Sequence, residues 1–168
     1  MAALGLRELT PVPTALREGL LVELTGRAGG LDPRPLSVSR CQTRFDVDLD
    51  QAQRVTQTAL AVFEQVSESW FEHRTRDLER LLSEAAALHE VGLFMGLSGF
   101  HKHGAYLISN CDLPGLSVQD QRALAALILC QRGRFSPERL ERFRLAKAVD
   151  LRLALVLRIA IRLNRTRQ

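Results

Sequence analysis

Residues 88–115 read LHEVGLFMGLSGFHKHGAYLISNCDLPG, and the interpretation of the whole chain starts from this stretch. Glycines and a Leu-Pro-Gly turn interrupt it, which predicts short helices joined by tight turns. The stretch also gathers three of the chain's four histidines with a glutamate and a lysine, in the order His89, Glu90, His101, Lys102 and His103. A cluster of this kind has both a chemical and a structural explanation.

The ionisable cluster allows three interpretations. Neighbouring His and Lys side chains can bind an anion or shift one another's protonation. A His-Glu pair followed by two further histidines can hold a metal ion. In a purely structural interpretation, His89 is a buried, hydrogen-bonded helix residue, and His101 and His103 cap the next helix. The residue types leave all three open.

On both sides of this stretch, apolar residues recur at helical spacing, which predicts an all-α bundle of about seven helices. The longest predicted helix covers residues 49–70, with Asp48 or Asp50 as its N-cap. Another opens at Ser117 and runs to about residue 130. The other helices are expected at around 37–44, 73–95, 104–109, 137–147 and 149–164.

The beginning of the chain differs from this bundle. Residues 3–12 alternate weakly and could form one strand, for which the sequence offers no partner strand. Residues 15–27 predict a short helix. A linker rich in Gly and Pro, residues 28–36, then leads into the helical domain at 37–168. We expect residues 1–27 to be the remnant of another domain.

Composition and charge limit the possible functions. The chain has 168 residues, 46% of them apolar, which is enough for one ordinary domain with a core. Its net charge of +4 is carried almost entirely by arginine, whose planar guanidinium suits phosphate oxygens. This balance permits a polyanionic partner, although solvated helix faces would give the same composition.

Cysteine spacing and hydropathy exclude other classes. The three cysteines, Cys41, Cys111 and Cys130, form no CxxC pair, so neither a zinc site nor a disulfide framework is predicted. Arginines interrupt the apolar run at 151–163, which predicts a buried helix of a soluble protein instead of a membrane span. We expect a cytoplasmic protein with neither a membrane nor a nucleic acid as its partner.

The stretch at 88–115 resembles the helical C-terminal domain of the Ppx/GppA exopolyphosphatase and guanosine pentaphosphate phosphohydrolase family. The resemblance lies in HEVG at 89–92, HKHGAYL at 101–107 and NCDLPG at 110–115. Further segments are similar to the family in the same order, namely ALREGLL at 15–21, RFDVD at 44–48 and the Arg-bearing helix at 151–167. The resemblance therefore covers nearly the whole chain.

The resemblance implies an HD-like helical bundle, with residues 1–27 as the tail of an actin-like catalytic domain. In the family, that catalytic domain removes the terminal phosphate of polyphosphate or pppGpp with a divalent cation such as Mg²⁺. The chain has neither a GxGxxG nor a GxxxxGK[ST] loop. We therefore expect an accessory domain that binds polyphosphate or pppGpp and supports a homodimer, without a catalytic residue, metal or cofactor of its own.

Candidate phosphate contacts follow from the charge of the side chains, although a solvated rim of the bundle would carry the same residues. The predicted polyphosphate contacts are His101, Lys102, His103, Arg132 and Arg134, whose cationic donors can hold successive phosphates. His89 and Glu90 are assigned to a structural, HD-like motif. A basic stripe at i, i+4 and i+7 of the last helix could face the catalytic domain, a polyanion or water, and consists of Arg158, Arg162 and Arg165.

Three positions depart from the family pattern, because Asp46, Leu97 and Gln131 stand where the family usually has histidine. HD-type metal hydrolysis needs several nitrogen and oxygen ligands around its cations. Three hypotheses follow. The chain is an accessory polyanion-binding domain, a degenerate structural or interaction domain without a ligand, or a standalone HD-type metal phosphohydrolase. Whether the chain is an enzyme by itself stays open.

Overall fold

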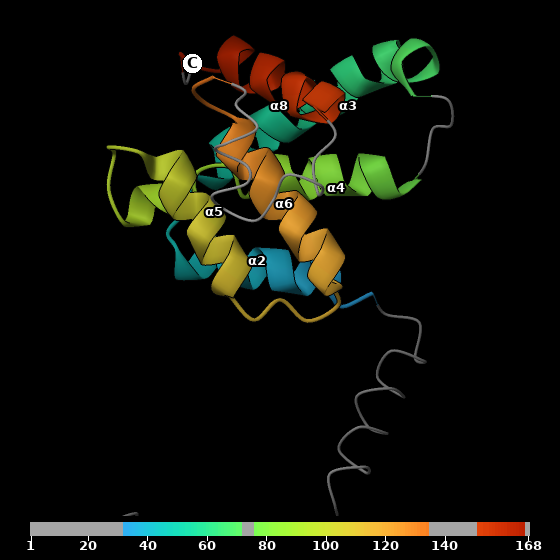
Figure 1. Cartoon of the computed structure of the whole chain (residues 1–168). Helices are drawn as coiled ribbons and strands as arrows, with labels where there is room; N and C mark the ends of the chain where they lie inside the picture. The colour runs from blue at the N-terminus through green and yellow to red at the C-terminus, as the bar shows by residue number, and fades with distance from the viewer. Residues whose placement is uncertain (1–31, 72–75, 135–150, 167–168) are drawn as a thin grey trace, which may run out of the picture. The chain divides into compact units, whose positions relative to one another are not determined.

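The computed structural model describes residues 32–71, 76–134 and 151–166. They form helices α2 (Arg34–Arg44), α3 (Leu49–Trp70), α4 (Arg76–Ala87), α5 (Phe100–Asn110), α6 (Val118–Cys130) and α8 (Leu151–Leu163), and a short 3₁₀ helix, η2 (Val91–Phe94) (Figure 1). These three ranges contain no strand, so the predicted all-α fold is confirmed. The predicted strand at 3–12 and the helices at 15–27 and 137–147 lie outside the described residues.

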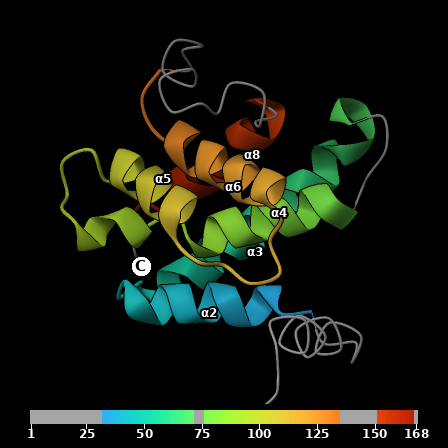
Figure 2. The ribbon, with the colours of Figure 1, turned by 60° about the horizontal axis from the view of Figure 1, so that its bottom comes forward.

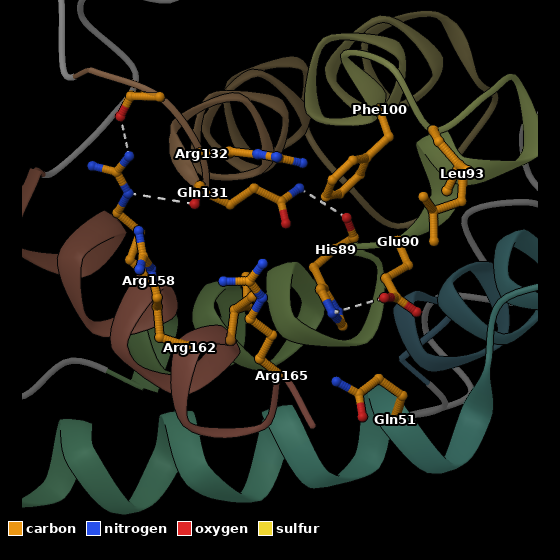
Figure 3. Close-up of a pocket in the computed structure, with 13 residues that line it drawn as sticks. Gln51, His89, Glu90, Leu93, Phe100, Gln131, Arg132, Arg158, Arg162 and Arg165 are labelled. Carbon is orange, nitrogen blue, oxygen red and sulfur yellow. Dashed lines mark hydrogen bonds and ion pairs between the residues drawn. The ribbon is translucent and has the colours of Figure 1, made fainter. Parts of the chain in front are cut away.

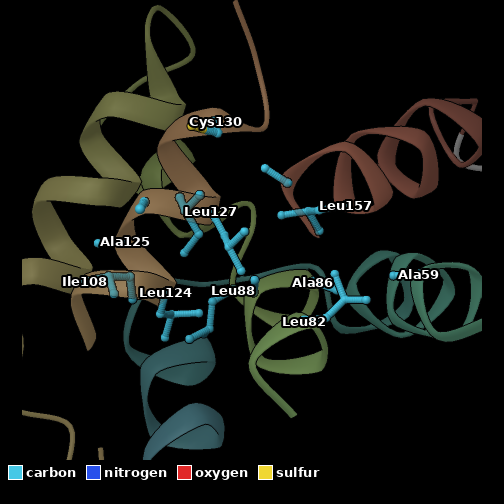
Figure 4. Close-up of a cluster of buried hydrophobic side chains, with 14 of the residues drawn as sticks. Ala59, Leu82, Ala86, Leu88, Ile108, Leu124, Ala125, Leu127, Cys130 and Leu157 are labelled. Atoms are coloured by element: carbon cyan, nitrogen blue, oxygen red, sulfur yellow. The ribbon is translucent and has the colours of Figure 1, made fainter. Parts of the chain in front are cut away.

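Two groups of helices meet at α4. Helix α3 packs against α4 and α8, while α5 packs against α6 and η2, and α4 also contacts α6 (Figures 1 and 2). The side chains at their junction are fully buried, including Leu82 of α4, Leu127 of α6 and Leu157 of α8 (Figure 4). Burial of each such leucine stabilises the fold by roughly 2 kcal/mol. This core holds the end of α6 and the middle of α8 beside each other.

The starts of two helices are confirmed as predicted. The carboxylate of Asp48 accepts a hydrogen bond of 2.9 Å from the backbone N–H of Gln51 and caps α3. Ser117 and Asp120 form a capping box at the start of α6, in which each side chain binds the other residue's backbone N–H. These caps satisfy donors that have no partner inside a helix.

Helix α2 begins at Arg34, three residues before the predicted start at 37. Pro35 is compatible with this start, because the first turn of a helix needs no N–H donor there. The Arg34 side chain is buried and makes two hydrogen bonds to Glu84, from Nε at 2.9 Å and from Nη2 at 3.0 Å. Its Nη1 also reaches Asp120 at 3.3 Å. The end of the predicted linker thus belongs to the helical unit.

The predicted helix at 73–95 is wrong in its second half. Helix α4 ends at Ala87, residues 88–90 form a turn, and η2 follows. The reason is Gly92, where an added Cβ would lie 1.9 Å from the carbonyl oxygen of Phe100 and 2.5 Å from the amide nitrogen of Gly104. The backbone of η2 therefore contacts the backbone of α5 directly. A continuous helix through this position would place side chains between the two segments.

Helix α5 begins at Phe100, four residues before the predicted start at 104. Gly99 precedes it with φ 71°, a left-handed conformation that favours glycine. Gly104 lies against Ile128 of α6, since an added Cβ would come within 2.9 Å of the Ile128 Cγ2 atom. The glycines of the 88–115 stretch therefore serve close packing as well as turns.

No helix within the described ranges has both the length and the hydropathy needed to cross a membrane.

The thiol of Cys41 gives a pH-dependent stability. Cys41 is buried, and this burial raises the pKa of its thiol from 9.0 to about 12. Because the unfolded chain releases this proton at lower pH, the free energy of unfolding should fall as pH rises above about 9, by up to roughly 1.4 kcal/mol per pH unit. Urea denaturation at pH 8, 9 and 10 measures the slope. The variant Cys41→Ala should show a shallower slope, and equal slopes would contradict the assignment.

Candidate anion-binding pocket

A pocket of about 370 Å³ lies where the turn at 88–90, the segment from η2 to α5, the end of α6 and helix α8 come together (Figure 3). Among the residues that the structure describes, its lining combines four arginines, one carboxylate and several apolar side chains. It consists of Gln51, His89, Glu90, Leu93, Leu97, Phe100, Gln131, Arg132, Gly133, Arg158, Ile161, Arg162 and Arg165. Segments far apart in sequence thus contribute to one site.

Arg158 has a different role in the structure from Arg162 and Arg165, the other two arginines of the basic stripe. The Arg158 Nε donates to the carbonyl oxygen of Gln131 at 3.3 Å, and its Nη2 donates to the carbonyl oxygen of Gly133. These carbonyls follow the last turn of α6, where the helix dipole favours a positive charge. Arg158 therefore joins α8 to the end of α6.

The other arginines of the pocket are exposed. Arg162 lies on the last turn of α8, Arg165 follows that helix, and Arg132 follows the end of α6. The Arg132 guanidinium lies 5.8 Å from the centroid of the Phe100 ring, a favourable cation–π distance. Glu90 is the one carboxylate among the described lining residues, and these side chains together carry a net positive charge.

His89 and Glu90 line the side of the pocket that lies opposite the arginines. His89 is 2% exposed, and its Nδ1 lies 2.7 Å from the carbonyl oxygen of Ala86. A carbonyl only accepts, so Nδ1 carries a hydrogen and donates it. The Nε2 of the ring lies 3.9 Å from the Glu90 Oε1. His89 is thus buried and hydrogen-bonded, as the structural interpretation expects, but in a turn and not in a helix.

Gln131 connects this turn to α6. Its side chain is buried, and Nε2 donates a hydrogen bond of 2.8 Å to the carbonyl oxygen of His89. That bond identifies the other terminal atom as the oxygen, and no donor in the described part of the chain reaches it. The residue that replaces a family histidine in the sequence comparison therefore supports the His89 turn.

The comparison with known proteins agrees with this architecture. Residues 34–168 match the model of Ppx/GppA phosphatase, domain III. The chain belongs to the Ppx/GppA phosphatase family. It is 35% identical over 159 residues to the guanosine-5'-triphosphate,3'-diphosphate pyrophosphatase of Aeromonas hydrophila subsp. hydrophila. The match covers 94% of this chain and 32% of that relative, so the chain spans about a third of the relative's length.

The structure separates the contact residues predicted for this Ppx/GppA domain III. Of the five, only Arg132 lines the pocket. His101 is buried within α5, and the His103 Nε2 lies 3.1 Å from the carbonyl oxygen of Ser98. Lys102 and Arg134 are exposed outside the lining. His89 and Glu90, predicted as a structural motif, both line the pocket.

Two pocket arginines were visible in the sequence without a definite role. The spacing of Arg162 and Arg165 on the last helix predicted a shared face, but not the element that it faces. No pattern in the sequence indicated that Gln51 of α3 would line a pocket. Within residues 32–71, 76–134 and 151–166 of this domain III, no group of three or more His, Cys, Asp or Glu side chains is placed to hold a metal ion.

Proposed function

We propose that this domain III is an accessory, phosphate-binding part of a Ppx/GppA phosphatase, which holds polyphosphate or pppGpp while another domain breaks the phosphoanhydride bond. The observation that supports this proposal is the pocket in which arginines from the end of α6 and from α8 converge. A guanidinium presents several fixed donors and forms paired hydrogen bonds with phosphate oxygens. The exposed positions of Arg162 and Arg165 leave their donors accessible to an anion.

Further parts of the proposal concern the whole enzyme. The chain corresponds to 32% of the length of its Aeromonas relative, which leaves room there for a separate catalytic unit. That unit would supply the divalent cation, such as Mg²⁺, and the reacting groups. We assign no catalytic residue to this chain. A cytoplasmic homodimer completes the proposal, on the basis of the family resemblance.

Removal of two pocket arginines tests anion binding. The double variant Arg162→Gln/Arg165→Gln should bind polyphosphate or pppGpp at least about tenfold more weakly at low ionic strength. Each substitution removes one attraction to the phosphates, and at low ionic strength salt screens that attraction only weakly. Isothermal titration calorimetry measures the dissociation constants.

A matched control is Arg122→Gln, since Arg122 is exposed on α6 and outside the lining. It should leave both affinities unchanged. Equal losses in the control and the double variant would assign the binding to overall charge, and an intact domain that binds neither polyanion would overturn the proposal.

A ligand-free structural role is the second candidate, favoured by the hydrogen bond through which Gln131 supports the His89 turn. It predicts no polyanion binding and unchanged stability in the Arg162→Gln/Arg165→Gln variant, as measured by thermal denaturation. A standalone metal phosphohydrolase would instead release orthophosphate from polyphosphate unaided, which a phosphate assay on the purified chain detects.

A further inference from the structure

We propose that Cys41 and Cys111 form a reversible disulfide bond when the protein meets a peroxide, and that this bond joins α2 covalently to the turn between α5 and α6. The inference is independent of the proposed function, because neither cysteine is among the described lining residues of the pocket. The spacing of the cysteines predicted no disulfide, but the fold brings together two that lie about seventy residues apart in the sequence.

The first observation is the contact between the two thiols. Both cysteines are free, and the Cys41 thiol donates a hydrogen bond to the sulfur of Cys111. Cys41 of α2 is buried, and Cys111, directly after the end of α5, is partly buried against the same hydrophobic core. A disulfide bond is about 2 Å long, which is shorter than a hydrogen bond between thiols. A small rotation of the side chains therefore has to bring the sulfurs together.

The second observation is that hydrogen bonds hold the backbone on both sides of this contact. One turn before Cys41, the Ser37 hydroxyl donates a hydrogen bond of 2.7 Å to the carbonyl oxygen of Pro114. The Gln121 Nε2 of α6 donates to the carbonyl oxygen of Cys111 at 2.7 Å. The bridge thus closes between segments that are already in place, which limits the strain that makes many introduced disulfides destabilising.

The third observation is a difference in exposure, which gives each cysteine its own step. Cys111 is the more exposed, so its thiolate attacks hydrogen peroxide, where an S–O bond forms, the O–O bond breaks and the second oxygen leaves as water after taking up a proton. Cys41 then attacks the resulting sulfenic acid. The S–S bond forms, the S–O bond breaks, and the Cys41 proton leaves with the oxygen as water. Two thiols and one peroxide give one disulfide and two waters, and a dithiol reverses the bridge by exchange.

Burial makes the formation of this bridge slow. It raises the pKa of both thiols, to about 12 for Cys41, and the nearby Arg44 guanidinium opposes only part of this rise. The thiolate is the attacking form, and little of it is present at neutral pH. The pair therefore responds to prolonged exposure to peroxide and not to a brief pulse.

The test treats the reduced, folded chain with hydrogen peroxide for several hours. Ellman's reagent in denaturant should then find one free thiol where the reduced chain has three, and dithiothreitol should restore all three. Mass spectrometry of unreduced peptides should find the peptide of Cys41 joined to that of Cys111, with the loss of two hydrogens. The midpoint of thermal unfolding should rise by at least about 5 °C, since the bridge closes a long loop of the unfolded chain.

Two variants make the test sharper, each compared in its reduced and oxidised forms after circular dichroism has verified its helices. Cys111→Ser keeps a hydrogen-bonding side chain and should lose both the bridge and the rise in midpoint. Cys130→Ala removes the third cysteine, which is buried in α6, and should keep both. Three remaining thiols, oxidation of Cys111 to a sulfinic acid with Cys41 unchanged, or a bridge to Cys130 in the parent chain would overturn the proposal. A bridge without a rise in midpoint would overturn it as well.

Discussion

The variant Gly92→Ala is expected to lose about 3 kcal/mol of its free energy of unfolding, or to fail to fold. The new Cβ would lie 1.9 Å from the carbonyl oxygen of Phe100 and 2.5 Å from the backbone nitrogen of Gly104. Both neighbours are backbone atoms within or next to the first turns of α5, so no side-chain rotation can make room. The 3₁₀ helix and α5 would have to separate. Chemical denaturation with circular dichroism measures the loss.

Another glycine of the same segment provides the control. Gly99 has φ 71°, and the nearest atom to an added Cβ is the Lys102 Cδ at 3.8 Å. Asparagine adopts this left-handed conformation more readily than other residues, so Gly99→Asn should cost only about 1 kcal/mol. If Gly92→Ala proved as mild as Gly99→Asn, the close approach of η2 and α5 described above would be incorrect.

Breaking the buried ion pair between α2 and α4 is the second large effect. The variant Glu84→Gln should lose about 3 kcal/mol, because the buried Arg34 guanidinium loses its two close hydrogen bonds to a carboxylate and keeps the longer contact with Asp120. Arg34 has a side-chain exposure of 6% and Glu84 of 9%, so water cannot replace the lost partner. The exposed pair of Arg80 and Asp77 is the control, since Asp77→Asn should change stability by less than about 0.5 kcal/mol.

Replacing both partners should restore most of that stability. Burial raises the pKa of Glu84, and this effect exceeds the lowering of its pKa by Arg34. A raised pKa means that the contribution of this carboxyl to stability declines as pH rises through its folded-state value. The charged pair is therefore costly, and Arg34→Met/Glu84→Leu should lie within about 1 kcal/mol of the parent chain. A double variant as unstable as Glu84→Gln would refute this account.

Helical periodicity was sufficient to predict much of the fold. The bounds of α3 and the caps at Asp48 and Ser117 followed from local patterns, because a cap and an apolar stripe are properties of neighbouring residues. The end of α4 at Ala87 did not follow, since it depends on where the backbone of Gly92 meets α5. Likewise, Arg34 was assigned to a linker because its buried partner Glu84 is fifty residues away.

The site was harder to predict than the helices. The HKHGAYL run contains the most conspicuous cationic side chains of the sequence, yet His101 is buried and Lys102 is exposed outside the pocket lining. The arginines of α8 showed a common face by their spacing alone. Their neighbours in the pocket come from α6 and from the His89 turn, and only the tertiary packing brings these elements together.

The direct contact of backbones at Gly92 also affects how sequences of this type diverge. A side chain at this position would collide with the backbone of α5, whereas the side chain of Leu97, at 81% exposure on the rim of the pocket, is under no such packing restriction. Descendants of one ancestor could therefore exchange their ligands through changes on the rim and still keep the same glycine. The backbone contact at Gly92 thus belongs to the scaffold, and the rim side chains are the part that can be changed without disturbing it.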